Sequence, residues 1–266
     1  MGANAIALFP AAAALLGLLI GSFLNVCIYR IVKEQSVVTP RSYCPACGEN
    51  IAWFDNIPLL SYILLRGDCR HCGEPISIRY PIVEVLTALI FALVGARYGM
   101  TLEALKWFFF EAILIALFFT DLEDRTLPDK LTISGSIAGL IFAVIIPMSG
   151  IFSELFLPQA KPVVQSCFEA VAAALLLTLP LWGLAAFWSR IRGLDMLGMG
   201  DVKMLPVLGI FLGIEHGITA LLIGSLSGVV IGGGYMLITR KPWTYELPLG
   251  TFFCLGAGLV PLLNKI

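Results

Sequence analysis

The chain has 266 residues, of which 59% are hydrophobic and only 13% are charged, and its formal net charge is -1. Soluble domains carry about 25% charged residues, so the composition excludes an ordinary soluble enzyme and predicts an all-α polytopic membrane protein. The small net charge says little about binding partners, of which we expect the lipid bilayer and no nucleic acid.

Eight apolar runs are candidate transmembrane helices, and they cover residues 5–29, 82–98, 104–120, 131–148, 168–188, 204–214, 217–238 and 249–263. A full crossing needs about 20 residues, so the sixth run is short. Pro206 near its start favours a tilted or broken element. We therefore expect about eight spans, with seven as the alternative.

The Lys and Arg residues indicate the orientation of these spans. With the N-terminus outside, 13 of them fall on the cytosolic side and 4 outside. This excess is the positive-inside pattern of membrane proteins. It predicts that residues 30–81, Asp121 and Asp201 all lie on the cytosolic side.

We expect three parts along the chain: a first transmembrane helix over 1–29, a cytosolic domain over 30–81 and a membrane core over 82–266. The middle part is the only polar segment long enough to form a small domain. Domains of this size rarely build a sufficient apolar core and often depend on a metal or disulfides.

Two Cys-x-x-Cys pairs lie within this segment, formed by Cys44 with Cys47 and by Cys69 with Cys72. A glycine follows each pair, and 21 residues separate the two pairs. Two such turns can complete a tetrahedral four-thiolate zinc site, and a reducing cytosol disfavours structural disulfides. We expect a structural zinc ion, because four thiolates leave no open position for water.

The other cysteines and His71 are not expected to bind the metal. Since the four cysteines suffice, His71 is interpreted as a surface residue. Cys27, Cys167 and Cys254 lie in or at the ends of apolar runs, where Cys usually acts as a small buried hydrophobe.

Two acids at the edges of apolar runs are the candidate catalytic residues. Asp201 directly follows Gly198-Met199-Gly200, and Asp121 ends the run from Phe108 to Thr120. Charge beside the bilayer is poorly solvated and is often functional. A coupled pair of carboxyl groups can share one proton, so that one acts as general base on water and the other as general acid toward a carbonyl. We expect Asp121 and Asp201 to act together on a peptide bond.

Other acids compete for this role. Glu123, Asp124 and Asp129 follow Asp121, and Asp129 is interpreted as a helix cap after Pro128. Asp195 is interpreted as a solvated loop residue. Glu111 lies in the middle of a span and is kept as a reserve candidate. The simpler alternative is that Asp121 and Asp129 only cap helices.

Several motifs in order resemble those of the type IV prepilin peptidases, which are membrane aspartyl proteases of the Gly-x-Gly-Asp group. They include Gly21–Arg30, the double Cys-x-x-Cys segment with Asp55–Tyr62, Arg79–Glu84, Asp121 with Leu127-Pro128-Asp129, and Gly198–Lys203. The resemblance covers most of the chain. It implies that Asp121 and Asp201 are the catalytic pair.

The resemblance further implies two activities in the bacterial cytoplasmic (inner) membrane. One is cleavage of prepilin or pseudopilin precursors on the cytosolic side, after a Gly that ends a basic leader. The other is N-methylation of the new N-terminal residue, usually Phe, with S-adenosyl-L-methionine as the methyl donor. The donor-binding residues do not transfer by motif; Asp55, Asn56 and Glu84 in or next to the cytosolic segment are candidates.

Three alternatives remain open at this stage. A peptidase without methyltransferase activity is one, although relatives that only cleave lack the zinc segment. An ion-coupled membrane transporter would explain acids near broken helices, but it has no need of a zinc domain. A zinc-bearing membrane scaffold without catalysis is the third, and Asp121→Asn distinguishes it because a scaffold would be unaffected.

Overall fold

The computed structural model describes residues 3–192, 198–240, 242 and 247–263. Within these residues, regular secondary structure consists of helices and two isolated β-bridges. The chain divides after Ala116 into two compact units, which are described separately below. The helix α4 (Leu102–Asp124) begins in the first unit and ends in the second.

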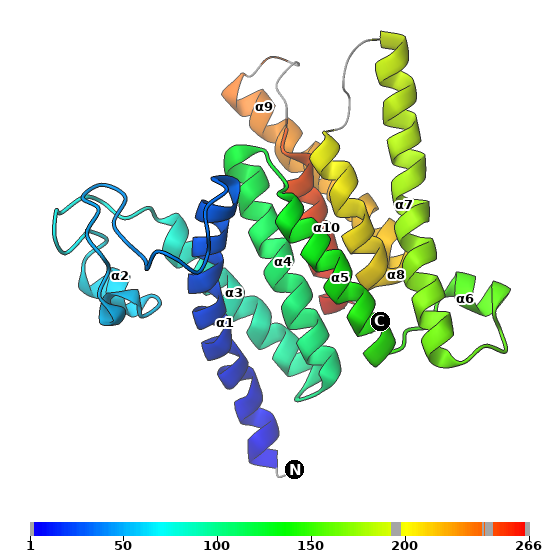
Figure 1. Ribbon diagram of the computed structural model, residues 1–266, viewed down its shortest axis with the longest axis horizontal. Coiled ribbons are helices and arrows are strands. Elements are labelled where there is room, and N and C mark those ends of the chain that lie inside the picture. Colours follow the sequence, from blue (N-terminus) through cyan, green and yellow to red (C-terminus); the bar gives the residue numbers. More distant parts are fainter. Residues whose placement is uncertain (1–2, 193–197, 241, 243–246, 264–266) are drawn as a thin grey trace. The chain divides into compact units, whose positions relative to one another are not determined.

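In the first unit, helices α1 (Ala3–Val32) and α3 (Arg79–Tyr98) pack along each other (Figure 1). Small residues permit this close contact. A Cβ atom added to Gly17 would lie 2.7 Å from the Cα of Ala88, and one added to Gly21 would lie 2.8 Å from the Cα of Glu84. Glycines spaced four residues apart on one face are typical of helices that associate within a membrane.

The segment between α1 and α3 contains only short elements. These are a 3-10 helix, Trp53–Asn56, and the helix α2 (Leu60–Leu64). Two bridges, Tyr43 with Asn50 and Asp68 with Pro75, each close a loop that holds one Cys-x-x-Cys pair. The segment therefore consists mainly of two closed loops and the turn that joins them.

The second unit contains the C-terminal end of α4 and the remaining helices (Figure 1). Their bounds are α5 Asp129–Ile145, α6 Ile151–Phe156, α7 Pro162–Arg192, α8 Met199–Ser227, a π-helix Gly228–Gly232, α9 Gly233–Thr239 and α10 Leu249–Leu263. Helix α8 packs against α5, α7 and α10. The core of this unit is therefore built around α8.

A break at Gly213 divides α8 into two halves. Gly213 has φ 71° and ψ -178°, which is not helical. In the first half, the Met204 sulfur lies 3.5 Å from the Cys254 sulfur of α10, and in the second half Ala220 and Gly224 contact Gly256 of the same helix. A straight helix from 204 to 224 would extend about 30 Å, so the chain must reverse at Gly213 and bring the halves side by side.

The break at Gly213 lies one residue before the end of the expected sixth apolar run, 204–214. Four described helical segments are long and apolar enough to cross a membrane: Leu8–Val32, Arg79–Tyr98, Pro162–Ile191 and Gly200–Thr239. Helix α10 is apolar but shorter. The all-helical fold is thus confirmed for the described residues, while the number of eight spans stays a prediction.

Candidate functional site

The two Cys-x-x-Cys loops have the same backbone structure. In the first, the Cys44 N–H donates to the Glu49 carbonyl at 2.9 Å, and the Gly48 N–H donates to the Cys44 carbonyl at 2.8 Å. The second repeats both bonds 25 residues later, from Cys69 to Glu74 and from Gly73 to Cys69, each at 2.9 Å. Gly48 and Gly73 have φ of 76° and 71°, a conformation that glycine adopts without steric cost.

The four cysteine sulfurs of these loops converge. All of them lie within 4.8 Å of one another, and the Cys44 and Cys72 sulfurs are 3.9 Å apart. With a Zn–S bond of about 2.3 Å, the sulfurs of a tetrahedral site lie about 3.8 Å apart. The donor set therefore fits zinc. His71 is exposed and lies outside this group, and Cys27 and Cys254 are buried while Cys167 is half-buried.

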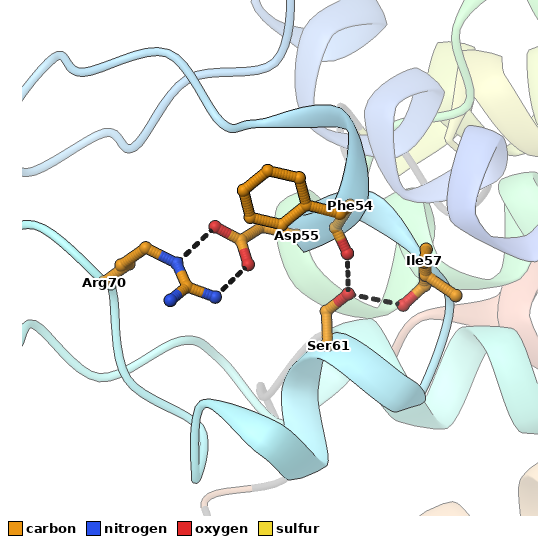
Figure 2. A network of polar contacts seen from close by, with 5 residues as sticks. All are labelled: Phe54, Asp55, Ile57, Ser61 and Arg70. Atoms are coloured by element: carbon orange, nitrogen blue, oxygen red, sulfur yellow. Dashed lines mark hydrogen bonds and ion pairs between the residues drawn. The ribbon is translucent and has the colours of Figure 1, made fainter.

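An ion pair links the second cysteine loop to the 3-10 helix. Figure 2 shows the Arg70 guanidinium donating two hydrogen bonds to the Asp55 carboxylate, at 2.7 and 2.6 Å. The Arg70 guanidinium also lies over the Phe54 ring, 5.5 Å from its centroid. The hydrogen bond from Arg70 holds the pKa of the Asp55 carboxyl below its usual range. The Ser61 hydroxyl bonds to the Phe54 and Ile57 carbonyls and closes the turn.

Further bonds attach this segment to α1 and α3. The Leu59 N–H donates to the Glu84 carboxylate of α3 at 2.8 Å. The buried Arg30 of α1 donates to the carbonyls of Ser36, Pro40 and Arg41. Asp55 and Glu84, two of the three candidates for binding the methyl donor, therefore have bonds within the fold.

Asp121, at the C-terminal end of α4, is buried against the first turn of α10. Its Oδ2 accepts two hydrogen bonds from Thr251, one from the backbone N–H at 2.6 Å and one from the hydroxyl at 2.9 Å. The side chain is 5% exposed. Among the described residues, no hydrogen bond reaches Oδ1. One oxygen of the carboxylate is thus held in place and the other is available.

Asp201, in the first turn of α8, lies beside the same end of α10. The backbone amides of Gly198 and Gly250 interact with its carboxylate, and the charge of Asp121 acts on it as well. Because Gly250 and Thr251 are consecutive, neighbouring amides in one helical turn interact with the two carboxylates. The N-terminus of a helix carries partial positive charge, so α10 offers both acids a favourable electrostatic environment.

Close packing of small residues brings these groups together. A Cβ added to Gly250 would lie 3.1 Å from the Cγ and Oδ2 atoms of Asp121 and 2.8 Å from the Leu127 side chain. A Cβ added to Gly200 would lie 3.2 Å from the Leu127 Cβ. Leu127, which is buried, therefore contacts both α8 and α10. A Cβ at either glycine would lie closer to these atoms than ordinary contact allows, so a neighbouring side chain would have to shift.

The competing acids lie elsewhere. Glu123 and Asp124 are exposed at the end of α4. Helix α5 begins at Asp129 as expected, but the N-cap is Pro128, and the Asp129 carboxylate forms a 2.6 Å ion pair with Lys203 instead of a cap hydrogen bond.

Two further acids, Glu111 and Asp195, competed for the same role. Glu111 belongs to the first unit, is 1% exposed and has no hydrogen-bond partner for its Oε1 among the described residues. Asp195 lies outside the described residues.

Sequence reasoning missed three residues that contact the candidate site residues. Gly250 and Thr251 have no charge, and nothing but Pro248 two residues earlier signals a helix start there. Arg70 stands between two metal-ligand candidates, and its spacing from Asp55 has no recognisable pattern. In each case the partner lies far away in the sequence: the Thr251 bond to Asp121 joins residues 130 positions apart.

These features define a class of protein: a helical membrane protein with a four-cysteine domain and two acids beside the same helix N-terminus. Residues 15–98 match the family of the bacterial peptidase A24 N-terminal domain, and residues 108–233 match the type IV leader peptidase family. No solved structure matches the chain.

Known relatives agree with these matches. The chain is 37% identical to a prepilin leader peptidase/N-methyltransferase of Myxococcus xanthus, over 85% of this chain and 63% of the relative. It is 31% identical to one of Xanthomonas campestris, over 95% of this chain and 90% of the relative, and 37% identical to one of Neisseria gonorrhoeae, over 82% and 79%. The chain belongs to the type IV leader peptidase family.

Proposed function

We propose that this protein cleaves the basic leader from prepilin-like precursors and N-methylates the new N-terminal residue. The observation that carries the peptidase activity is that Asp121 and Asp201 both lie against the first turn of α10. Relatives named for both activities cover most of the chain. The site lies in a bacterial inner membrane protein, and we place it on the cytosolic side by the distribution of Lys and Arg.

Asp121 and Asp201 work as a coupled pair. One carboxylate removes a proton from water, whose oxygen attacks the scissile carbonyl carbon, while the other carboxyl group donates its proton to the carbonyl oxygen. When the C–N bond of the tetrahedral intermediate breaks, the amine nitrogen receives the proton that the first carboxylate took from water. A hydroxyl proton of the intermediate returns to the other carboxylate, which leaves the product acid and restores both groups. Thr251 holds Oδ2 of Asp121 in place, so that Oδ1 can contact the reacting groups.

The methyl-transfer step needs a neutral amine rather than a pair of acids. The lone pair of the new N-terminal nitrogen forms a bond to the methyl carbon of S-adenosylmethionine. The bond between that carbon and sulfur breaks, sulfur keeps the electron pair, and the amine releases one proton to water. We therefore expect a separate site for this step.

Zinc supplies structural stability in this proposal. Cys44, Cys47, Cys69 and Cys72 would hold one ion per chain, and their backbone loops are already arranged for it. A four-thiolate ion has no open position for substrate, so it takes no direct part in either reaction. The Arg70–Asp55 ion pair connects the second cysteine loop to residues 53–61, so metal binding to the loops also stabilises that turn.

The substrate is expected to enter from the membrane. A precursor with a basic leader and a long apolar helix can place the helix in the bilayer and the leader in the cytosol. The scissile bond then lies at the interface. A Gly before this bond would allow close approach to the two acids.

The decisive experiment compares purified variants on one precursor. Asp121→Asn and Asp201→Asn should each abolish leader cleavage, because one carboxyl group cannot perform both proton transfers. Asp124→Asn and Asp129→Asn are matched controls and should retain substantial activity. Cleavage is followed by gel shift and by mass spectrometry of the mature N-terminus. Full cleavage by Asp201→Asn would contradict the assignment.

The two activities should also separate. Asp201→Asn should still methylate a pre-cleaved peptide that starts with Phe. If this variant is folded and methylates no such peptide, the two reactions share one site.

A further inference from the structure

We propose that a cavity between α1 and the loop after it binds the methyl donor, S-adenosylmethionine. This inference rests on the proposed methyltransferase activity and locates its second substrate. The cavity has a volume of about 380 Å³, within the range of about 300–1,000 Å³ typical of small-molecule sites. Leu19, Phe23 and Val26 of α1 form one wall, and Pro40, Arg41 and Asn56 belong to the other.

The place of the cavity in the fold suits a separate methylation site. All its lining residues belong to the first unit, whereas Asp121 and Asp201 belong to the second. The lining residues also fall within residues 15–98, which match the N-terminal domain family. The two acids fall within residues 108–233, which match the peptidase family. Methyl transfer does not need the acids, so nothing in its chemistry requires the donor to lie beside them.

The polar groups of the cavity are available to a ligand. Among the described residues, the side chains of Arg41, Ser42 and Asn56 have no hydrogen-bond partner, although all three line the cavity. By contrast, the guanidinium of Arg30, which lines the cavity from α1, already donates to three carbonyls. The free groups differ in chemistry: a cation, a hydroxyl and an amide that both donates and accepts.

These groups match the parts of S-adenosylmethionine. Arg41 can bind the carboxylate of the methionine portion with two parallel hydrogen bonds. Asn56 can donate to and accept from the edge of adenine. The Phe23 ring, which is 51% exposed, offers a face to the adenine ring or to the positive sulfonium. Val26, Pro40 and neighbouring apolar side chains exclude water from the rest.

The wall that carries Asn56 is held from two sides. Arg70, between two zinc-ligand candidates, grips the adjacent Asp55 with two hydrogen bonds (Figure 2). On the other side, Leu59 is bonded to Glu84 of α3. The position of Asn56 therefore depends on the cysteine loops, which gives the zinc domain a role in donor binding without direct contact between metal and donor.

The first test measures donor binding to the purified full-length protein by titration with S-adenosylhomocysteine, an unreactive analogue. Arg41→Ala should weaken binding about tenfold to a hundredfold, the loss expected when a hydrogen bond to a charged group is removed. Val26→Trp should weaken it by a similar factor, because the larger ring occupies part of the cavity. Arg41→Lys should restore part of the affinity, because it keeps the charge but not the paired geometry. Leu8→Trp adds the same ring to an exposed position of α1 and is the control.

A second measurement uses the unaltered protein and so does not depend on variants that fold. Radiolabelled S-adenosylmethionine is crosslinked by ultraviolet light, and the labelled peptide is identified by mass spectrometry. We expect the label on peptides that contain residues 19–42 or Asn56. Label confined to residues 117–266 would overturn the assignment.

The outcomes distinguish a wrong donor site from a wrong proposed function. If the unaltered protein binds the analogue and methylates peptide, but Arg41→Ala and Val26→Trp bind it equally well, the cavity is not the donor site and the proposed function stands. If the unaltered protein neither binds the analogue nor methylates pre-cleaved peptide, the methyltransferase activity itself is wrong, and this inference is wrong with it.

Discussion

Gly250 provides a sharp test of the arrangement around the two acids. In Gly250→Ala, the new Cβ would lie 3.1 Å from the Cγ and Oδ2 atoms of Asp121, whereas ordinary contact begins at 3.4 Å. The neighbouring Leu127 side chain, at 2.8 Å, can turn aside because the contact is with its terminal methyl group. The Asp121 carboxylate has less freedom, because Thr251 bonds to it and the Asp side chain is short. The whole carboxylate must therefore move away from the new Cβ.

The size of the effect follows from this displacement. Normal contact returns when the Asp121 carboxylate moves about 0.3 to 0.9 Å away from the new Cβ. Because about 1 Å of misplacement in an active site can lower the rate about a hundredfold, we expect cleavage to slow by about fourfold to sixtyfold. Thermal stability should not fall in parallel, because alanine is the better helix former by about 1 kcal/mol. A loss of activity without loss of stability is the expected signature.

The assay compares kcat/KM for leader removal with the temperature of unfolding. Gly234→Ala is the matched control, because a Cβ at Gly234 meets no atom within 4 Å. It should cleave at the unaltered rate. If Gly250→Ala also cleaves at that rate, then the α10 N-terminus does not position Asp121 for catalysis, and the reasoning above is refuted.

Three further predictions follow from other contacts. Thr251→Val should slow cleavage about tenfold or more, the value of a hydrogen bond to a charged group, while Thr251→Ser should stay close to the unaltered rate; equal rates for both variants would argue against the hydroxyl. Cys69→Ser should abolish zinc binding and speed hydrogen exchange over residues 40–75, because in small sites metal binding is folding energy; metal analysis that finds no zinc in active, unaltered protein would exclude this role. Glu169→Ala should lower the free energy of unfolding by about 1–3 kcal/mol by leaving a buried amide unsatisfied, since the 1% exposed Glu169 accepts the Ser153 N–H at 2.9 Å; Glu169→Gln, which keeps an acceptor, should be milder in a detergent-unfolding assay.

Much of the four-cysteine cluster and of the helical framework could be predicted from the sequence, because both depend on local spacing. A Cys-x-x-Cys pair followed by glycine forms its loop through bonds among six consecutive residues, Cys44 to Glu49 in the first case. An apolar run of about 20 residues has few alternatives to a helix in a membrane. Asp121 and Asp201 stood out because acids are costly at such positions.

Tertiary structure alone decided which distant groups meet. Thr251 bonds to Asp121 across 130 residues, and Arg70 reaches Asp55 through a turn that no spacing rule predicts. The reversal of α8 depends on the positive φ of Gly213, one of 26 glycines in the chain. Asp129 similarly fits the pattern of a cap, yet it pairs with Lys203 because α8 begins beside it. Local bonds are encoded in neighbouring residues, whereas these contacts depend on how whole helices pack.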